Sequence, residues 1–186
     1  MATLEPMAEN TARIEVRLRE LAQLFNSMDP SPFIDRDLDA DAEDFIVSWA
    51  REHPERHELM LSIHLATPPP PDRAAGVQEA VQHYFKTRAH LKHSEFRHLM
   101  RRGRQALLVG VLFLVGCLFL GSQVPKLGTG TAVDILREGL TILGWVAMWR
   151  PIQIYLYDWW PLLEEQRLFG RLARMHVRLV LPAASS

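Results

Sequence analysis

The sequence predicts an α+β protein: a small domain, mostly helical with a short sheet, is attached to a transmembrane helical hairpin. The first observation behind this prediction is a run of 16 residues without a polar side chain, Ala106–Gly121. The second is the alternation of apolar and polar residues over Glu58–Ala66, which is typical of a strand. The third is a segregation of charge, because residues 1–72 carry 15 acidic and 6 basic residues, whereas residues 73–104 carry 2 acidic and 8 basic ones.

The composition excludes several classes of protein. Hydrophobic residues make up 48% of the 186 residues, charged residues make up 23%, and the net charge is −1 with histidine neutral. These values exclude a disordered polyelectrolyte and a collagen-like chain. The single cysteine, Cys117, excludes an intrachain disulfide and gives no sign of an oxidising compartment. Residues 1–25 carry charges throughout and lack the apolar core of a secretory signal, so we expect residues 1–100 not to be exported.

Residues 1–72 are predicted to form the cytosolic α+β domain. Residues 12–25 are interpreted as an amphipathic helix, although alternation over Arg13–Leu18 also allows a strand there. A turn-rich loop follows, and then a second helix at Asp41–Glu52, which Asp39 or Asp41 can cap. The apolar face predicted for this helix consists of Ala42, Phe45, Ile46, Trp49 and Ala50.

The strand Glu58–Ala66 is followed by Pro68–Pro71, a stiff polyproline connector. Asp72 is expected to cap a long helix, and residues 73–104 form its basic juxtamembrane part. Apart from Gly103, nothing stops this helix before the apolar run. A short strand at His176–Pro182 lies in the tail, residues 159–186. An isolated strand is unstable, so we expect this one to pair with Glu58–Ala66.

Residues 105–158 are predicted to form the transmembrane hairpin. With its flanks, the first apolar run reaches about 20 residues, which as a helix crosses a hydrocarbon core of about 30 Å. Only a helix can do this, because lipid offers no hydrogen-bond partners to the backbone. The second apolar run, Gly139–Trp149, is too short alone, so we expect a span of roughly Val133–Tyr155 that bends at Pro151 or Pro161. A reentrant hairpin is the alternative.

Basic residues predict the orientation of the hairpin. They flank both of its ends, whereas the connecting segment, Gln123–Ala132, has only Lys126. The positive-inside rule then places both termini in the cytoplasm. Aromatic and basic residues at the inner boundary are expected to contact anionic lipid headgroups. These headgroup residues are Arg101, Arg102, Arg104, Trp149, Trp159 and Trp160.

Arg150 is the most informative residue of the predicted second span. Its guanidinium group either reaches the inner interface by snorkelling or lies inside a bundle. In the second interpretation Arg150 lines a pore or an inter-subunit site, with Asp158 or the Asp134 of another helix as its partner.

Other polar groups are interpreted as solvated surface. His83, His90, His93 and His98 lie on one arc of the long helix, roughly opposite its apolar stripe. The acidic segment Asp35–Asp44 lacks the residue spacing of a calcium-binding loop. The alternative is that this segment faces the basic helix, of its own chain or of a neighbour's. No catalytic motif occurs, so we predict no catalytic, cofactor or metal residues, and no nucleic-acid partner.

The runs EGLTILGWVAMWRPIQIYLYDWWP (Glu138–Pro161) and RLRELAQLFNSMDPSPF (Arg17–Phe33) resemble a family of uncharacterised bacterial two-span inner-membrane proteins. The resemblance implies a bacterial inner-membrane location and no activity. We therefore predict a non-enzymatic membrane protein that acts as an oligomeric scaffold or as an accessory subunit of a larger complex. The alternative is a homo-oligomeric ion channel or transporter with a cytosolic gating domain. A metal-responsive regulator that uses the helix histidines is a third hypothesis.

Overall fold

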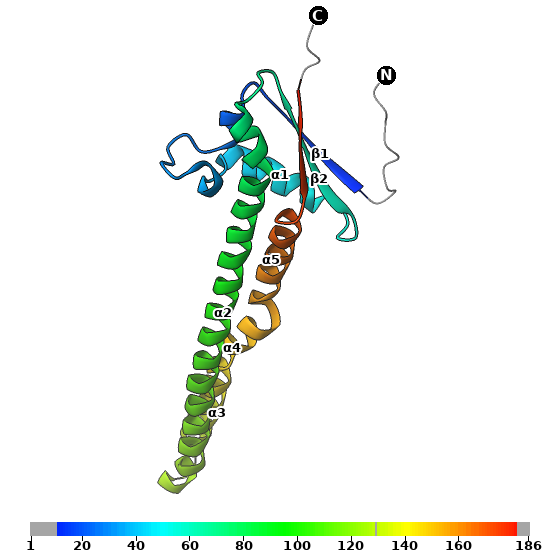
Figure 1. The fold of residues 1–186 in the computed structure, drawn as a ribbon. Helices are drawn as coiled ribbons and strands as arrows, with labels where there is room; N and C mark the ends of the chain where they lie inside the picture. The colour runs from blue at the N-terminus through cyan, green and yellow to red at the C-terminus, as the bar shows by residue number, and fades with distance from the viewer. Residues whose placement is uncertain (1–10, 129, 182–186) are drawn as a thin grey trace, which may run out of the picture. The chain divides into compact units, whose positions relative to one another are not determined.

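The computed structural model of the protein describes residues 11–128 and 130–181 (Figure 1). They form two compact units. Unit 1 consists of residues 11–91 and 164–181, and unit 2 consists of residues 92–128 and 130–163. The protein therefore combines helices with a small three-stranded sheet, as the sequence predicts. The longest element, α2, contributes its first part to unit 1 and its second part to unit 2.

The sheet of unit 1 consists of β1 (Thr11–Leu18), β2 (Glu58–Leu65) and β3 (His176–Val180), in the order β1-β2-β3. Both pairs of strands are parallel. The predicted pairing of the tail strand with the 58–66 strand is confirmed, because Met60 lies beside His176 and His64 beside Val180. Pro182, the last residue of the predicted strand, lies outside the described residues. The two parallel crossovers place helices between successive strands, an arrangement that the sequence pattern did not predict.

The predicted helix over residues 12–25 is wrong, and the competing strand is right. Ala12, Ile14 and Val16 are buried, with the residues between them at least partly exposed, which is the period of a strand. Pairing with β2 along the whole of β1 stabilises the strand more than the weak helical periodicity would stabilise a helix. The β-branched residues Ile14 and Val16 also favour a strand. Leu21 and Leu24 of the predicted helix are buried as part of a 3-10 helix, Leu21–Leu24. This short helix begins with a capping box between Glu20 and Gln23.

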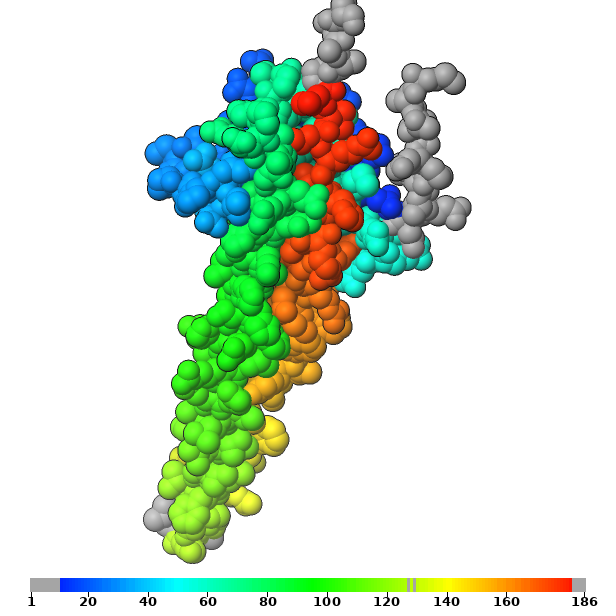
Figure 2. All heavy atoms as spheres, viewed as in Figure 1, coloured from blue at the N-terminus to red at the C-terminus, as the bar shows by residue number. Residues whose placement is uncertain are grey.

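Helix α1 (Ala40–Arg51) crosses from β1 to β2, close to its predicted range. Its cap is Asp39, whose carboxylate accepts a hydrogen bond from the Asp41 amide at 3.1 Å. Ile46 and Ala50 are buried on the predicted apolar face, whereas Phe45 is exposed. The loop before α1 forms a lobe on the surface of unit 1, blue in Figure 2.

The core of unit 1 lies between one face of the sheet and the helices. Phe85 of α2 stacks with Phe169 of α5 (Trp160–Leu172), at 6.3 Å between ring centroids. Apolar side chains of all three strands, α1, α2 and α5 belong to one buried cluster or pack against it. Its members with no measurable exposure include Ile14, Leu24, Ile46, Leu61, Ile63, Ala80, Val81, Phe85 and Leu172.

Helix α2 (Pro71–Gln123) is 53 residues long and continuous through Gly103 into the apolar run, as expected. Asp72 does not cap it. The helix already begins at Pro71, so Asp72 lies in the first turn, and the amides of Arg73 and Ala74 both donate to the Pro70 carbonyl at 3.0 Å. Proline is favoured at the first helical position, because its missing N–H has no partner to lose there.

The second arm consists of α3 (Thr131–Ala147), α4 (Trp149–Gln153), a π-helical turn (Ile154–Asp158) and α5. The expected bends occur as two interruptions, at Met148 and at Trp159. Each interruption lies just before a proline, whose missing N–H explains it. Pro151 has no N–H to donate to the Ala147 carbonyl, and Pro161 has none to donate to the Tyr157 carbonyl. In the part of the chain that the structure describes, one helix, α2 with its short extension to Lys126, is long and apolar enough to cross a membrane. The second span therefore stays a prediction.

Candidate membrane-embedded segment

The apolar run of α2 turns most of its large side chains outward. Ten of them are between 37% and 65% exposed, and 22% of the most apolar 18-residue window is buried inside the protein. A core helix of a globular protein would bury these residues, and exposed apolar patches of this kind mark contact with lipid or with another protein. The ten are Leu107, Leu108, Val109, Val111, Leu112, Phe113, Val115, Leu118, Phe119 and Leu120.

The narrow buried side of this run is a seam of small residues spaced seven apart: Gly103, Gly110 and Cys117. A Cβ atom on Gly110 would lie 3.1 Å from the Ala147 carbonyl oxygen. One on Gly144 of α3 would lie 2.8 Å from Leu114 Cδ1. Small residues let two helix backbones approach this closely. The seam was not predicted from the sequence, although its spacing of seven residues is visible there.

The neighbours of the glycines show which residues of the two arms lie at the same height along α2. Gly121 lies beside Arg137, Gly110 beside Pro151, and Gly103 beside Tyr155. The second arm therefore runs antiparallel to α2 along the whole apolar run. The three charged side chains at the start of α3, those of Asp134, Arg137 and Glu138, lie near its far end.

Two of the three residues predicted as an intramembrane site lie together. Arg150 Nη1 lies 3.6 Å from Asp158 Oδ2, and both belong to unit 2. Arg150 is at the level of Gly110, inside the apolar run, whereas Asp158 lies beyond the level of Gly103 and so outside that run. The guanidinium group is thus directed toward the basic end of the hairpin, which is the geometry of snorkelling.

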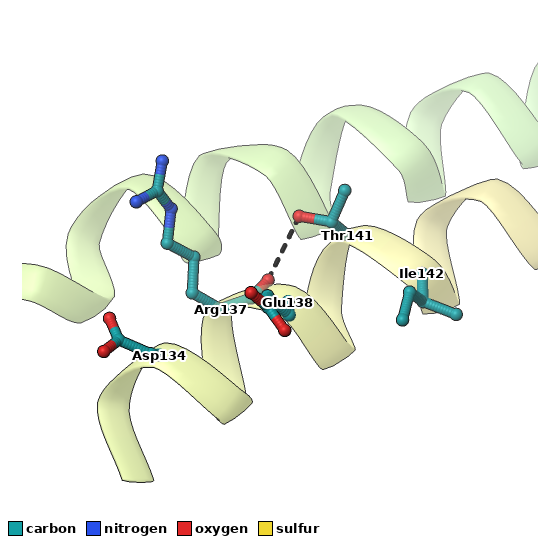
Figure 3. Close-up of a pocket in the computed structure, with 5 residues that line it drawn as sticks. All are labelled: Asp134, Arg137, Glu138, Thr141 and Ile142. Carbon is teal, nitrogen blue, oxygen red and sulfur yellow. Dashed lines mark hydrogen bonds between the residues drawn. The ribbon is translucent and has the colours of Figure 1, made fainter. Parts of the chain in front are cut away.

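Asp134 does not lie beside Arg150 within one chain, and a pairing with the Asp134 of another helix stays a prediction. Asp134 lies with Arg137, Glu138, Thr141 and Ile142 around a shallow hollow on α3 (Figure 3). The Thr141 hydroxyl donates to the Arg137 carbonyl at 3.0 Å, so it is satisfied within its own helix. The charged groups of this hollow occupy the first two turns of α3, where they mark the end of the apolar band.

Basic and aromatic residues gather at the opposite end of the band. Arg101, Arg102 and Arg104 are exposed, and the Gly103 contact places the segment from Tyr155 to Trp160 at their level. Trp160 exposes more than half of its surface at this end, whereas Trp149, which is also exposed, lies near the level of Gly110, inside the apolar run and not at the predicted boundary. Trp159 is half-buried, and its indole N–H donates to the Tyr155 carbonyl at 2.8 Å, which leaves its ring rather than its N–H for a headgroup contact.

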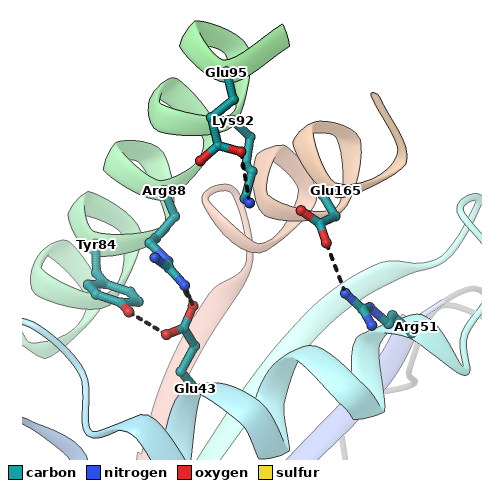
Figure 4. A network of polar contacts seen from close by, with 7 residues as sticks. All are labelled: Glu43, Arg51, Tyr84, Arg88, Lys92, Glu95 and Glu165. Atoms are coloured by element: carbon teal, nitrogen blue, oxygen red, sulfur yellow. Dashed lines mark hydrogen bonds and ion pairs between the residues drawn. The ribbon is translucent and has the colours of Figure 1, made fainter. Parts of the chain in front are cut away.

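The polar contacts of unit 1 join its helices (Figure 4). Glu43 of α1 accepts hydrogen bonds from Tyr84 at 2.6 Å and from Arg88 Nε at 2.8 Å, both on α2. The Arg88 guanidinium lies over the Phe169 ring. Burial, followed by the hydrogen bond to Glu43 and its charge, raises the pKa of Tyr84 well above its usual value near 10.

A second ion pair joins helices of unit 1, and another lies within the unit 2 part of α2. Arg51 of α1 lies 3.7 Å from Glu165 of α5, and within α2 Lys92 lies 3.0 Å from Glu95. Together with the Glu43–Arg88 pair, the contact of Asp35 with His83 at 3.5 Å confirms that the acidic segment faces the basic helix of its own chain.

The four helix histidines are all exposed on α2. Among the described residues, no group of three or more His, Cys, Asp or Glu side chains is arranged to hold a metal ion. A hollow at the start of β2 and β3 has a lining of mixed charge, which includes Glu55, Arg56, Glu58, Arg171 and Arg174. Arg171 there donates to the Pro54 and His57 carbonyls, so it holds the loop before β2.

Comparisons with protein-family models, with curated proteins and with solved structures found no match. The resemblance to two-span inner-membrane proteins therefore stays a prediction. What the geometry itself provides is a long apolar helix, closely packed along one narrow side and uncovered on the others.

Proposed function

We propose that this is an integral membrane protein of the bacterial inner membrane, in which unit 1 is a cytosolic interaction domain and unit 2 is the anchor. In this proposal the protein is not an enzyme and acts as an oligomeric scaffold or as an accessory subunit of a larger complex. The observation that carries the proposal is the outward exposure of the ten apolar side chains of α2. In water this surface would be strongly unfavourable, at about 25 cal/mol for each Å² of apolar area.

Both arms of the hairpin cross the membrane in this proposal. The seam supports a full second crossing over a reentrant loop, because it extends from Gly121 to Gly103 and so covers the whole apolar run. Charged side chains also support it. Arg137 lies at one end of the run and Asp158 beyond the other, while Arg150, between them, reaches toward Asp158.

The basic end of the hairpin faces the cytoplasm, as the positive-inside rule requires, and both termini follow it. Exposed Arg101, Arg102 and Arg104 then contact anionic headgroups, each contributing about 1 kcal/mol. Trp159 and Trp160 anchor the second arm at the same boundary, whereas Trp149 lies deeper, near the level of Gly110.

A scaffold or subunit is favoured over the channel alternative by the absence of a polar lining in the described part of the hairpin. The outward face of α2 between Ala106 and Gly121 has no polar side chain, and between Gly139 and Trp149 the one hydroxyl, that of Thr141, is bonded to its own helix. Ion flux through the purified protein in liposomes would contradict the scaffold and support the channel.

Cysteine labelling in intact cells tests the topology. In a Cys117→Ala background, single cysteines are placed at the exposed positions Thr67, Lys126 and Arg174. We expect a membrane-impermeant maleimide added from outside to label position 126 alone, and positions 67 and 174 only after lysis. Labelling of position 126 only after lysis would contradict two complete crossings.

A further inference from the structure

The sheet of unit 1 has a second face that is almost entirely polar. The helices and the core cluster lie on the face of Ile14, Leu61 and Val177, which are neighbours across the three strands. Side chains alternate along a strand, so the intervening residues point to the opposite face. They form three rows across the sheet, Arg13–Met60–His176, Glu15–Ser62–Arg178 and Arg17–His64–Val180.

This polar face carries an excess of basic groups. Its one carboxylate, Glu15, lies 4.0 Å from Arg13 and 3.9 Å from His64. Arg17 and Arg178 are exposed and form no ion pair with any residue that the structure describes. The nine residues include no aromatic side chain that could insert into lipid, so the face is suited to an acidic polypeptide more than to a membrane surface.

The opposite side of unit 1 carries unpaired acidic groups. Within the acidic segment, Glu43 and Asp35 contact α2 and Asp39 caps α1. Three further carboxylates, those of Asp37, Asp41 and Asp44, are exposed and make no ion pair within the described residues. This segment leads into α1, which packs on the helical side of the sheet.

We propose that the polar sheet face of one copy of this protein binds the acidic segment of a second copy. Basic and acidic surfaces are complementary, and charge complementarity sets both the partner and the relative orientation in such contacts. The two surfaces differ and lie on opposite sides of the sheet, so the contact is head-to-tail. Such contacts build rings when the rotation closes and open arrays when it does not. The inference deepens the proposed scaffold function by naming its contact surface, and it rests on that function.

The test measures self-association of the full-length protein in detergent micelles by analytical ultracentrifugation over a range of concentrations and salt. One variant, R17E/R178E, reverses the charge of the sheet face, and a second, D41K/D44K, reverses the acidic segment. A matched control, R73E/K86E, reverses two exposed basic residues on α2. Circular dichroism melting checks that each variant is folded.

We expect the wild type to form oligomers that weaken as salt is raised, because exposed charges are screened. Each double variant should raise the dissociation constant at least tenfold, while the control leaves it unchanged. In a mixture, D41K/D44K still offers an intact sheet face and R17E/R178E an intact acidic segment. The two reversed surfaces are again opposite in charge, so the mixture should regain oligomers in which the two variants alternate.

Other results would overturn the inference in distinguishable ways. An oligomer that neither variant weakens would refute this interface and leave the membrane scaffold standing. If the mixture stayed monomeric, the two surfaces would not be partners. If R17E/R178E lost binding to vesicles of anionic lipid and kept its self-association, the sheet face would be a lipid surface. A wild type that is monomeric at all concentrations would refute both this interface and the oligomeric scaffold, whereas the cysteine labelling tests the anchor separately.

Discussion

Two apolar stretches of the protein, the inward side of β2 and the middle of α2, have opposite surroundings. In β2 the side chains of Leu59, Leu61, Ile63 and Leu65 are 0–4% exposed, because β1, β3 and the helices surround them. In α2 the ten apolar side chains of the run 106–121 stay open on every side except the seam. Hydrophobicity alone therefore does not distinguish a core from a membrane anchor. What distinguishes them is whether the rest of the chain can cover the surface.

The surroundings of charged side chains also differ between the two units. In unit 1 charged groups occur close to the core, where Glu43 is matched by hydrogen bonds from Tyr84 and Arg88. In unit 2 the charged groups of α3 and Asp158 lie toward the ends of the apolar band, and Arg150 is directed out of it. A buried charged group without a hydrogen-bond or ion-pair partner is costly in either setting. Unit 1 supplies such partners from the protein, whereas a lipid environment supplies them only at its boundaries with water.

The largest difference between the regions is expected from matched truncations of leucine. Leu61→Ala in β2 should lower the free energy of unfolding of unit 1 by about 2–5 kcal/mol, because it leaves a cavity in the core. Leu112→Ala on the open face of α2 should leave that free energy unchanged. Urea titration in detergent, followed by circular dichroism, measures both. Equal effects would contradict the assignment of Leu112 to an uncovered surface.

Removal of the acidic partner in unit 1 should have the next largest effect. Glu43→Ala deprives Tyr84 and Arg88 of their common acceptor, and we expect a loss of about 1–3 kcal/mol in the same urea titration. Arg88 is partly exposed, so water offsets some of the cost of the unpaired charge. Asp44→Ala, one position further along α1 and exposed, is the matched control and should be nearly neutral.

The seam is tested by adding side chains to its glycines. Gly144→Leu should destabilise the hairpin by about 1–3 kcal/mol through overpacking, whereas Gly139→Leu has open space and should be tolerated. A sharper version uses Gly144→Cys, whose Cβ atom would lie 3.2 Å from Cys117 Cβ. Because this is close to the separation found in disulfides, mild oxidation should join the two, and Gly139→Cys should stay reduced. No cross-link at position 144 would refute the seam.

A smaller effect is expected at alkaline pH. The pKa of Tyr84 is raised in the folded protein, so an unfolded chain loses the phenolic proton at a lower pH than the folded one. Its contribution to stability is complete below pH 10 and falls as the pH rises above that value. Tyr84→Phe should therefore lose less stability than the wild type between pH 9.5 and 11, as followed by thermal melting. Identical pH profiles would contradict the buried contact with Glu43.

The smallest effect is expected from Arg150→Leu. The ion pair with Asp158 is exposed on the arginine side, and exposed pairs contribute about 0–1 kcal/mol. Membrane insertion should be unchanged, as measured by resistance to alkaline extraction. Loss of assembly or of ion flux in this variant would instead support a pore or inter-subunit role for Arg150.

Much of unit 1 could be predicted from the sequence because its pattern is local. Alternation identified β2 and β3, and a capped periodic run identified α1. The first strand was misassigned because Ile14, Leu18, Leu21 and Phe25 also fit a helical face, and only pairing with β2 decides the matter. Parallel strand direction and the polar sheet face depend on pairing between distant segments, which no local pattern contains.

In unit 2 the sequence indicated the apolar helix but not its packing. Spacing by seven places Gly103, Gly110 and Cys117 on one side of α2, yet only the second arm shows that this side is a contact. The interruptions at Met148 and Trp159 follow from Pro151 and Pro161, which were anticipated as bends. The exact positions of these interruptions could not be predicted from the sequence and are seen only in the backbone structure. The reason is that proline disturbs the hydrogen bonds of the preceding turn rather than those at its own position.

The most direct test of a lipid-covered α2 is the accessibility of spin labels in the purified protein reconstituted into bilayers. A label at position 112, introduced as Leu112→Cys with Cys117→Ala, is compared with a label at the exposed position 67 of unit 1, introduced as Thr67→Cys in the same background. We predict that the label at 112 collides freely with oxygen, which dissolves in lipid, and rarely with a water-soluble nickel complex, while the label at 67 collides freely with the nickel complex. Frequent collision of the label at 112 with the nickel complex, or protection from both reagents, would contradict lipid contact at this face.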